Sequence, residues 1–576
     1  MILGKLKYGQ LFIKKAYLQN RLFSLKNKRL QTVKSIEVKT TDQPGDENSV
    51  HVVTQKSEEL ISDLFPAPRI VPMVLSTKEP VVLSFDDVPG PKSLKYMSTF
   101  RQYISEIGTQ TIASILTAGL NIGTYWQSKK NAKSFSILFD KYGPVVRFVN
   151  PVGGDVVLIN RSDHIQKVYT MEGEHPVRSA LDSLEKYRTE HRNHAYGGIY
   201  TVYGPEWIRR RSMVDIPLQS AITQHIQGIC ESSNKLTQKL YNLRNYQDEV
   251  QKDLEKEINK WAFDCMGLII FSKKFAMLDT ELINSQCDTS WLYHSLEKAS
   301  EAIAKCESGM RLWKLFNTPA WYSLVKNCDT LDNLIGKHIL EVEQTISLSY
   351  ENDTITDANR LIGAMLLGED KMSIEDIATV LMDMLLIGVN TITSAVSFLL
   401  YFIAKHQRVQ RLLYQEIENV TPESNADNIT NLRGTTPYLQ ACIKETLRLA
   451  PPIPLLTRVL PKNIVLDKYN IPRGTLIIMA IQDAAFKENN YDDAAKFYPE
   501  RWLNIDSNSH AVASISFGYG ARKCLGQNIA ETMITLLTIK ILQKYKLEYH
   551  YGDIEPTRSF IAKPSKPLKI RFIDRI

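Results

Sequence analysis

The chain has 576 residues, of which 44% are hydrophobic and 9% aromatic. It can therefore bury a large core, and its composition excludes a wholly disordered chain, a collagen and a small disulfide scaffold. Its formal charge of +7 comes from residues 1–36, which hold nine Lys or Arg and no Asp or Glu. When these nine are subtracted from the 70 basic residues, 61 remain against 63 acidic ones. The body therefore lacks the basic excess of a nucleic-acid-binding protein, and we expect no nucleic acid partner.

The N-terminal segment, residues 1–36, mixes Leu, Ile, Phe and Tyr with Lys and Arg and contains no acid. This pattern is typical of a mitochondrial presequence. The alternative is a basic amphipathic helix that the mature protein retains on its surface. Residues 37–84 follow as a predicted flexible polar spacer, and the folded body is expected from residue 85 to residue 576.

Two stretches lack charge for long enough to suggest a membrane helix. Residues 107–128 are uncharged but rich in Thr, Ser, Asn and Gln, so we expect them at most to lie on a membrane surface. Residues 384–404 are more apolar, but they belong to a longer helical pattern. It starts with a capping box from Ser373 to Asp376 and ends at His406. This helix of about 34 residues is predicted to be the buried spine of a helical domain.

The rest of the body is mostly helical by pattern, with β-like runs at 145–149, 155–159, 463–466 and 475–481. The seven cysteines include no C-x-x-C pair. The odd number and the lack of such a pair argue against a disulfide framework and a structural zinc site, and this cysteine usage fits a reducing compartment.

The most specific stretch runs from Phe517 to Gly526 (FGYGARKCLG) and precedes a helical pattern. Cys524 follows two basic residues, Arg522 and Lys523, and comes just before a helix N-terminus. Positive potential of this kind favours a metal-binding thiolate. The glycines of the loop would let its backbone approach a flat ligand closely. For an isolated cysteine of this kind, an inert loop thiol would be the alternative.

The loop resembles the haem-binding signature F-x-x-G-x-R-x-C-x-G of the cytochrome P-450 monooxygenases. Three further motifs of that family occur in its order: Trp207-x-x-x-Arg211, Glu445-x-x-Arg448 and the PERW segment at 499–502. The resemblance covers residues 85–576. It implies a cytochrome P-450 fold, mainly α with smaller β-sheets, in a single large haem domain with a long central I helix.

Three stretches resemble the mitochondrial clan of the family, in agreement with the predicted presequence. They are residues 172–192, 259–267 and 443–466. The resemblance therefore implies a mitochondrial protein that is associated with the matrix side of the inner membrane, where it contacts the membrane surface.

The resemblance also assigns roles. Cys524 would be the axial ligand of the iron of haem b (iron protoporphyrin IX), where a cysteinate favours cleavage of the O–O bond. Haem carries two propionates, and buried anions need cations or hydrogen-bond donors. Further cofactor-binding residues are Trp207, Arg211, Arg458, Phe517 and Arg522. Glu445, Arg448 and Arg501 would form a charge-balanced network that locks the core behind the cysteine loop.

Thr391, at the centre of the long helix, matches the family threonine that assists proton delivery to oxygen. Its surroundings depart from the family pattern, because Asn390 stands where an acid is usual. An amide can orient a water molecule but cannot release a proton near pH 7. Asp383, seven residues earlier on nearly the same predicted helix face, could feed a water chain. Alternatively, Asp383 faces solvent or caps a loop.

Partners and substrate follow from the same reading. No flavin or nicotinamide domain is evident, so electrons must come from another protein. The clan implies an adrenodoxin-like ferredoxin with its NADPH reductase, docked near Lys444 and Lys523. Gln440, Gln527 and Asn528 replace cations that are usual there, so we expect weak docking. The substrate pocket is expected from residues 180–203, 383–391 and 453–457. The histidines of Glu190-His191-x-x-His194 are expected on the surface, without a metal.

The leading hypothesis is a monooxygenase that inserts one oxygen atom from O2 into a hydrophobic, sterol-like, steroid-like or other lipid substrate. The second is an enzyme of the same fold that rearranges an oxygenated lipid without external electrons, which Asn390 favours. The third is a non-catalytic haem protein, which Thr391 disfavours.

Overall fold

The computed structural model describes most of the folded body. The described residues are 82–91, 134–149, 155–178, 181–250, 254–279, 287–307, 312–314, 316–351, 361–368, 372–420, 432–503, 515–557 and 559–575. They all lie in the second of the two units into which the chain divides, Pro80–Ile576. The expected presequence, the spacer up to residue 81 and the uncharged stretch 107–128 lie outside the described residues.

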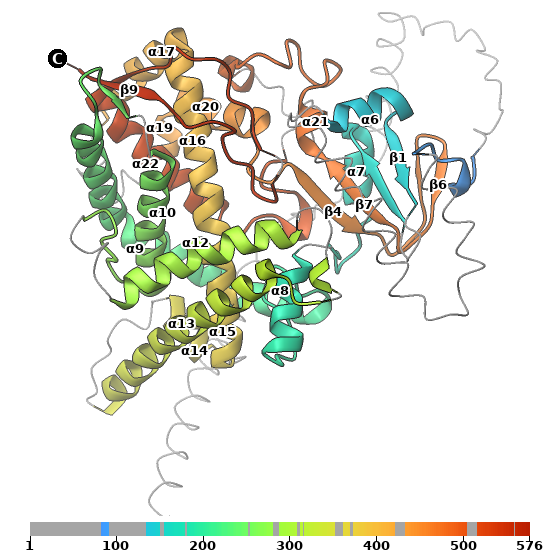
Figure 1. The fold of residues 1–576 in the computed structure, drawn as a ribbon, viewed down its shortest axis with the longest axis horizontal. Coiled ribbons are helices and arrows are strands. Elements are labelled where there is room, and N and C mark those ends of the chain that lie inside the picture. Colours follow the sequence, from blue (N-terminus) through green and yellow to red (C-terminus); the bar gives the residue numbers. More distant parts are fainter. Residues whose placement is uncertain are drawn as a thin grey trace, which may run out of the picture. The chain divides into compact units, whose positions relative to one another are not determined.

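A four-stranded sheet has the order β1-β2-β7-β4 (Figure 1). Its strands are β1 (Val145–Phe148), β2 (Val156–Ile159), β4 (Leu455–Val459) and β7 (Leu476–Ala480). β1 runs antiparallel to β2, β2 parallel to β7, and β7 antiparallel to β4. The register pairs Arg458 with Ile477, and this pairing fixes the position of Arg458 along the sheet. Three of these strands coincide with runs that the sequence predicts, and β4 was not predicted.

Two smaller sheets complete the β structure of the described residues. One has the order β3-β9-β8, and the other pairs β5 with β6. Their strands are β3 (Glu249–Val250), β5 (Ile464–Leu466), β6 (Tyr469–Ile471), β8 (Tyr545–Glu548) and β9 (Ile570–Asp574). β9 therefore brings the C-terminal part of the chain beside residues that precede α10.

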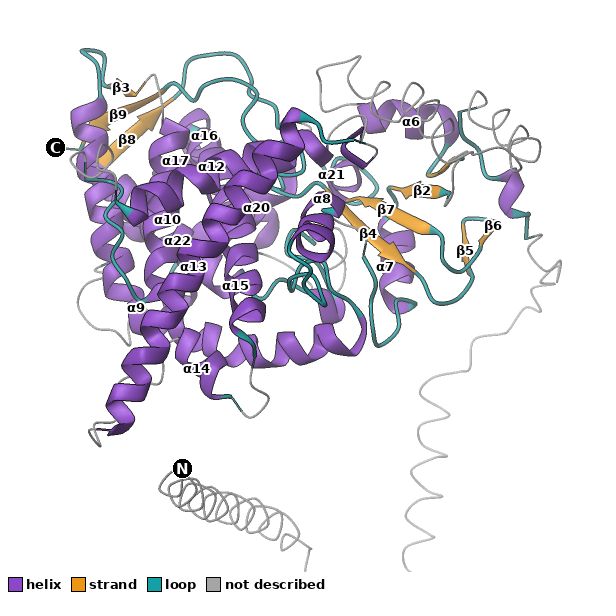
Figure 2. Cartoon of the chain, turned by 60° about the horizontal axis from the view of Figure 1, so that its bottom comes forward, coloured by secondary structure: helices purple, strands orange, loops and turns teal. Residues whose placement is uncertain are grey.

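Helices make up most of the rest (Figure 2). The longer ones are α9 (Gly204–Leu243), α10 (Leu254–Phe271), α12 (Asp288–Glu307), α13 (Pro319–Glu351), α17 (Gln407–Ile417), α20 (Pro437–Leu449) and α22 (Gln527–Lys544). Shorter ones are η1 (Phe85–Asp87), α6 (Ser134–Tyr142), α7 (Ser162–Thr170), α8 (Asp182–Lys186), η2 (Tyr187–His191), η3 (Leu312–Lys314), α14 (Leu361–Leu367), α19 (Leu432–Thr435), α21 (Ile481–Ala485), η5 (Pro499–Trp502) and η6 (Gly520–Arg522). The structure is therefore mainly α with smaller β-sheets, as predicted.

The predicted spine exists, but it is not one regular α-helix. It consists of α15 (Ile374–Asp383), the π-helical segment η4 (Met384–Val389) and α16 (Asn390–Lys405). The predicted cap is present, because the Ser373 hydroxyl accepts the backbone N–H of Asp376 at 3.1 Å. In the described part of the chain, this segment of 32 residues is the one helix apolar and long enough to cross a membrane.

Most of this central helix is buried inside the protein. It packs against α10, α13, α20 and α22, and its residues belong to the largest hydrophobic cluster of the core. α10 lies beside it and is buried on almost every face, with Trp261 and Phe263 fully inaccessible. The apolar character of the central helix is therefore that of a core element.

Candidate functional site

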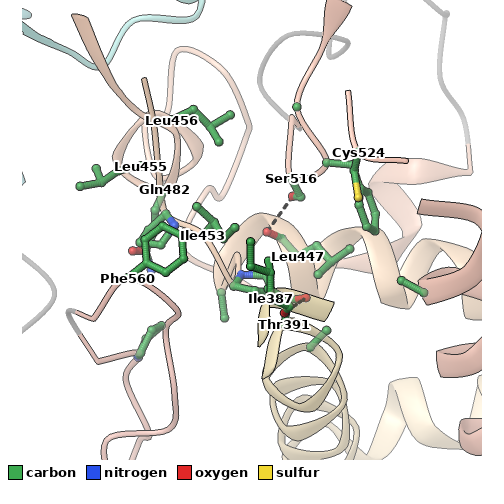
Figure 3. Close-up of a pocket in the computed structure, with 18 of the residues that line it drawn as sticks. Ile387, Thr391, Leu447, Ile453, Leu455, Leu456, Gln482, Ser516, Cys524 and Phe560 are labelled. Carbon is green, nitrogen blue, oxygen red and sulfur yellow. Dashed lines mark hydrogen bonds between the residues drawn. The ribbon is translucent and has the colours of Figure 1, made fainter. Parts of the chain in front are cut away.

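A cavity of about 1240 Å³ lies between the central helix and the cysteine loop. Its walls include Leu181, Ile199 and Tyr200, residues 453–457 and part of the central helix from Asp383 to Thr391. The three pocket segments expected from the sequence thus all contribute. Figure 3 shows Cys524, Thr391 and Phe560 around this space. The volume exceeds that of an ordinary site for one drug-sized molecule.

The cysteine loop turns tightly because two of its glycines adopt conformations that side chains disfavour. Gly518 has a φ of 74° and Gly520 a φ of 71°, a region that glycine enters without steric cost. A Cβ atom on Gly520 would also lie 2.3 Å from the Glu172 carboxylate. The turn closes when the backbone N–H of Cys524 donates to the Phe517 carbonyl at 2.9 Å. Phe517 itself lines the cavity.

The Cys524 side chain is exposed, and the space that it faces is the cavity. It precedes α22, and the backbone N–H of Gly526 donates to its sulfur. Burial raises the pKa of the thiol, while this N–H, Arg178 and Arg211 act to lower it. The cations with the largest effect are therefore not the adjacent Arg522 and Lys523 that the sequence suggested. A bound metal ion would take the thiolate and release its proton.

Four arginines line the same cavity: Arg178, Arg211, Arg458 and Arg522. Arg522 is buried and donates to the carbonyls of Pro176 and Val202, at 2.9 and 2.8 Å. Its remaining terminal nitrogen, Nη1, has no hydrogen-bond partner in the part of the chain that the structure describes. The guanidinium lies 3.9 Å from the ring centroid of Trp207, which is also buried.

The arginine cluster has too little negative charge around it. Among the described residues, Glu172 is the one carboxylate that forms an ion pair with any of the four, and it binds Arg458 through Nε. Burial lowers the pKa of Arg522 to about 8, and Arg178, Arg458 and Arg211 add to this shift by repulsion. A buried cluster of this kind is stabilised by an anionic ligand with more than one charge.

The two residues expected beside the reacting centre point to different places. Thr391 lines the cavity, and its hydroxyl donates to the carbonyls of Ile387 and Gly388 at 2.9 and 3.1 Å. The amide of Asn390 instead donates to the Ser300 hydroxyl on α12, at 3.0 Å, and to the Leu386 carbonyl. Our expectation that Asn390 orients water beside Thr391 is therefore wrong for this structure, because its amide tethers the central helix to α12.

Asp383 is not exposed, and its carboxylate binds the loop that precedes α9, as the loop-capping alternative expects. Its carboxylate is buried and pairs with Arg188 at 2.7 Å. It also accepts the backbone N–H of Tyr200 at 2.9 Å. The solvent-facing alternative is therefore wrong. Asp383 fixes the segment that precedes α9 to the central helix, and it also lines the cavity.

Glu445 is the centre of a buried polar network behind the cysteine loop. Arg448 binds both of its carboxylate oxygens at 2.8 Å. Arg501 and the Trp502 indole donate to it at 3.1 and 2.9 Å. Burial acts to raise the pKa of Glu445, but Arg448 and these donors hold it below its ordinary value. The three charged residues that the sequence grouped together are thus in contact.

The remaining predicted residues lie at the surface. Lys444 on α20 and Lys523 in the cysteine loop are both exposed. His191 is exposed and pairs with Asp329. Among the described residues, no group of His, Cys, Asp and Glu side chains could hold a metal ion.

Sequence reasoning missed three residues of the site: Glu172, Arg178 and Phe560. The first two lie in the stretch 172–192, which was noted only as a resemblance. Phe560 reaches the cavity from a loop near the C-terminus. No local sequence pattern predicts this contact. Tyr200 lies in the expected pocket segment 180–203, but it was not singled out there.

Comparisons with known proteins agree with this geometry. The sequence model of the family "Cytochrome P450" matches residues 112–572. The chain is 28% identical to "Probable cytochrome P450 301a1, mitochondrial" of Drosophila melanogaster, over 87% of this chain and 89% of that protein. It is 28% identical to the mitochondrial 1,25-dihydroxyvitamin D(3) 24-hydroxylase of Mus musculus, over 78% and 86%. It is 27% identical to cytochrome P450 CYP12A2 of Musca domestica, over 75% and 84%.

The chain belongs to the cytochrome P450 family, and it is a monooxygenase of that family. Its relatives include several that are named mitochondrial. The family implies a haem-iron cofactor, and the residues present fit one. Cys524 offers a thiol to the cavity, and the four arginines with the unpaired Arg522 nitrogen suit the two propionates.

Proposed function

We propose that the protein inserts one oxygen atom from O2 into a hydrophobic lipid, sterol-like or steroid-like, with electrons from a ferredoxin. The observation that carries this proposal is that Cys524 and Thr391 line one cavity whose other walls are largely apolar. Leu455, Leu456 and Phe560 are among them (Figure 3). A hydrophobic molecule is stabilised there by about 25 cal/mol for each Å² of apolar surface removed from water.

In this proposal, Cys524 binds the iron of haem b as a thiolate, and the bound haem supplies activation of O2. The propionates are held by the four arginines of the cavity, Arg178, Arg211, Arg458 and Arg522. The Trp207 ring packs against the Arg522 guanidinium. The buried network around Glu445 keeps the cysteine loop in place, because the Ser516 hydroxyl donates to the Leu447 carbonyl at the end of the same helix.

Thr391 is the residue that we assign to proton delivery. Its hydroxyl can turn from the Ile387 and Gly388 carbonyls toward a water molecule in the cavity. The π-helical segment η4 ends at Val389, two residues before Thr391. Such segments are frequent at functional sites.

The electron donor in this proposal is a small acidic iron–sulfur ferredoxin, reduced by an NADPH-dependent reductase. Lys444 and Lys523 offer exposed positive charge near the cysteine loop. Gln440, Gln527 and Asn528, which stand where cations are usual, bond to other side chains of the protein: Gln440 to Thr535, Gln527 to Glu531 and Asn528 to Arg433. They therefore add no charge to attract the donor, and docking should be weak.

The proposed location is the matrix side of the mitochondrial inner membrane. It is supported by the basic, acid-free residues 1–36 and by the relatives that are named mitochondrial. Import of a reporter fused to residues 1–36 into isolated mitochondria tests the targeting step. A reporter that stays outside would contradict it.

The experiment that tests the activity uses purified protein, isotopically labelled O2, and ferredoxin with its reductase and NADPH. Sterols, steroids and fatty acids serve as the substrate panel. One labelled oxygen atom in a product, with one NADPH consumed for each product molecule, is the expected result. A product formed without NADPH or O2 would instead establish an enzyme that rearranges an oxygenated lipid. That alternative is favoured by Asn390, which stands where the family usually has an acid.

A further inference from the structure

Tyr200 is held by three separate parts of the chain. Its backbone N–H donates to the Asp383 carboxylate at 2.9 Å, and its carbonyl accepts from Arg178 Nε at 3.1 Å. The Arg178 guanidinium lies 3.9 Å from the centroid of its ring. The Phe560 ring meets it edge-on, with centroids 6.0 Å apart. The position of the Tyr200 side chain is therefore fixed before any ligand binds.

The phenol of Tyr200 is a hydrogen-bond donor that has no partner among the described residues. Tyr200 lines the cavity, and both of its hydrogen bonds with the described residues are made by its backbone. Burial raises the pKa of its phenol, which Arg178 opposes, while Asp383 and Cys524 raise it further. The hydroxyl therefore keeps its proton. Because Tyr200 and Cys524 line the same cavity, the phenol belongs to the same site as the thiol.

Neighbouring polar groups of the cavity are already engaged. Asp383 accepts from Arg188 and from the Tyr200 backbone, and Thr391 donates within its own helix. Around Tyr200, the walls include the apolar side chains of Ile199 and Phe560. A hydroxyl in such surroundings gains more from a ligand hydrogen bond than it would in water, and it rejects a ligand that leaves it unpaired.

We propose that Tyr200 is a specificity-determining residue whose hydroxyl donates to an oxygen atom on the substrate. The substrate is then a hydrophobic molecule that carries a hydroxyl or carbonyl oxygen, and this oxygen lies at the Tyr200 wall while a carbon is presented beside Thr391. The inference rests on the proposed function, since it assumes that haem and a hydrophobic substrate share the cavity. It adds which residue selects the substrate and by which chemical group.

The test uses the haem-loaded full chain and probes that do not require the natural substrate. The probes are N-alkyl imidazoles of increasing chain length, in which the imidazole binds the haem iron and the chain ends either in a hydroxyl or in a methyl group. Binding is followed by the absorbance change of the haem. At the chain length that reaches Tyr200, the hydroxyl probe should bind about fivefold tighter than the methyl probe, the effect of one net hydrogen bond.

Tyr200→Phe should remove this preference, because it keeps the ring, the contact with Arg178 and both backbone hydrogen bonds. Tyr203→Phe is the matched control, since Tyr203 is 56% exposed and should leave the preference unchanged. A hydroxyl preference that survives Tyr200→Phe, or its absence at every chain length, would overturn the proposal. So would an equal loss of affinity for both probe series or a lower haem content, which would make Tyr200 a support of the cofactor.

The outcomes separate this proposal from the proposed function. If no imidazole changes the haem spectrum, the haem-thiolate site itself is wrong. If imidazoles bind but the terminal oxygen makes no difference, the haem site stands and only the role of Tyr200 falls.

Discussion

Arg188 and Asp383 form an ion pair of 2.7 Å in which both side chains are buried. The pair joins two π-helical segments, because Arg188 belongs to η2 and Asp383 immediately precedes η4. Two nitrogens of Arg188, Nε and Nη1, have no hydrogen-bond partner within the described ranges. Arg188 Nη2 also donates to the Thr379 carbonyl of α15 at 3.3 Å. The segment that forms one wall of the cavity is thus attached to the central helix through the Asp383 carboxylate and through this carbonyl.

We predict that Arg188→Met destabilises the folded protein by about 3–5 kcal/mol, because it leaves the Asp383 carboxylate buried without its cationic partner, while the Tyr200 backbone N–H still donates to it. Urea unfolding measures this difference. Lys298→Met is the control, since it removes an exposed pair with Glu301 and should cost no more than about 1 kcal/mol. The double variant Arg188→Met with Asp383→Leu should recover part of the loss. If Arg188→Met and Lys298→Met lower the free energy of unfolding equally, the role of the buried pair is contradicted.

The second prediction concerns the stability of the protein in acid. The hydrogen bond from Arg209 lowers the pKa of Glu206 to about 2 from its ordinary 4.5, against burial and with help from Arg210. Between these two pH values the unfolded chain binds the proton more tightly than the folded protein. The contribution of Glu206 is therefore complete above pH 4.5 and is lost as the pH falls through about 2.

Glu206→Gln should consequently flatten the fall of the unfolding free energy with decreasing pH in this window. The free energy of unfolding, measured by urea titration at several pH values, gives the slope. An unchanged slope in the variant would show that Glu206 is not held in its charged form by the two arginines.

The cysteine loop and its supporting network could be predicted because the residues that define them are close in the sequence. Glu445 and Arg448 are three residues apart on one helix and contact each other directly. The same holds for the loop glycines, whose positive φ values follow from their residue type. Local patterns thus predicted the cysteine loop and the polar network behind it.

The side of the central helix on which Asn390 lies could not be predicted, because the prediction assumed a regular α-helix. Six residues between Asp383 and Asn390 form a π-helical segment, and each wider turn changes which side chains share a face. As a result Asp383 lines the cavity, whereas Asn390 bonds to Ser300 on α12. Arg178 was missed for a different reason, since its position depends on contacts between distant segments, and for the same reason Tyr200 was not singled out within the expected segment 180–203.

The third prediction concerns Thr391. Thr391→Ala should divert most electrons from product to peroxide or water, lowering the fraction that ends in product about tenfold, because a positioned proton donor contributes at least that much. The ratio of product to NADPH consumed is the measurement. Thr393→Ala is the matched control, since Thr393 is buried two residues away and bonds to the Val389 carbonyl. Equal ratios in Thr391→Ala and the wild type would remove Thr391 from the mechanism.

The fourth prediction concerns electron transfer. Lys444→Glu should slow ferredoxin-supported turnover about tenfold at low salt, with a smaller effect at high salt, because it replaces an attractive charge with a repulsive one. Steady-state turnover measures this effect, and stopped-flow reduction of the haem by ferredoxin measures the electron-transfer step itself. Lys298→Glu changes the same charge on α12 and should have little effect. Turnover that is indifferent to Lys444→Glu, or that is better supported by a microsomal diflavin reductase, would contradict docking at this lysine.

The central claim is that Cys524 binds the iron of haem as a thiolate. The absorbance spectrum of the reduced carbon monoxide complex tests it most directly. In the wild type and in Cys442→Ser, which changes a buried cysteine of α20, the main band should stand at the position characteristic of thiolate-ligated haem. Cys524→His should move it to the position of histidine-ligated haem. A histidine-type band in correctly folded wild-type protein would contradict the assignment.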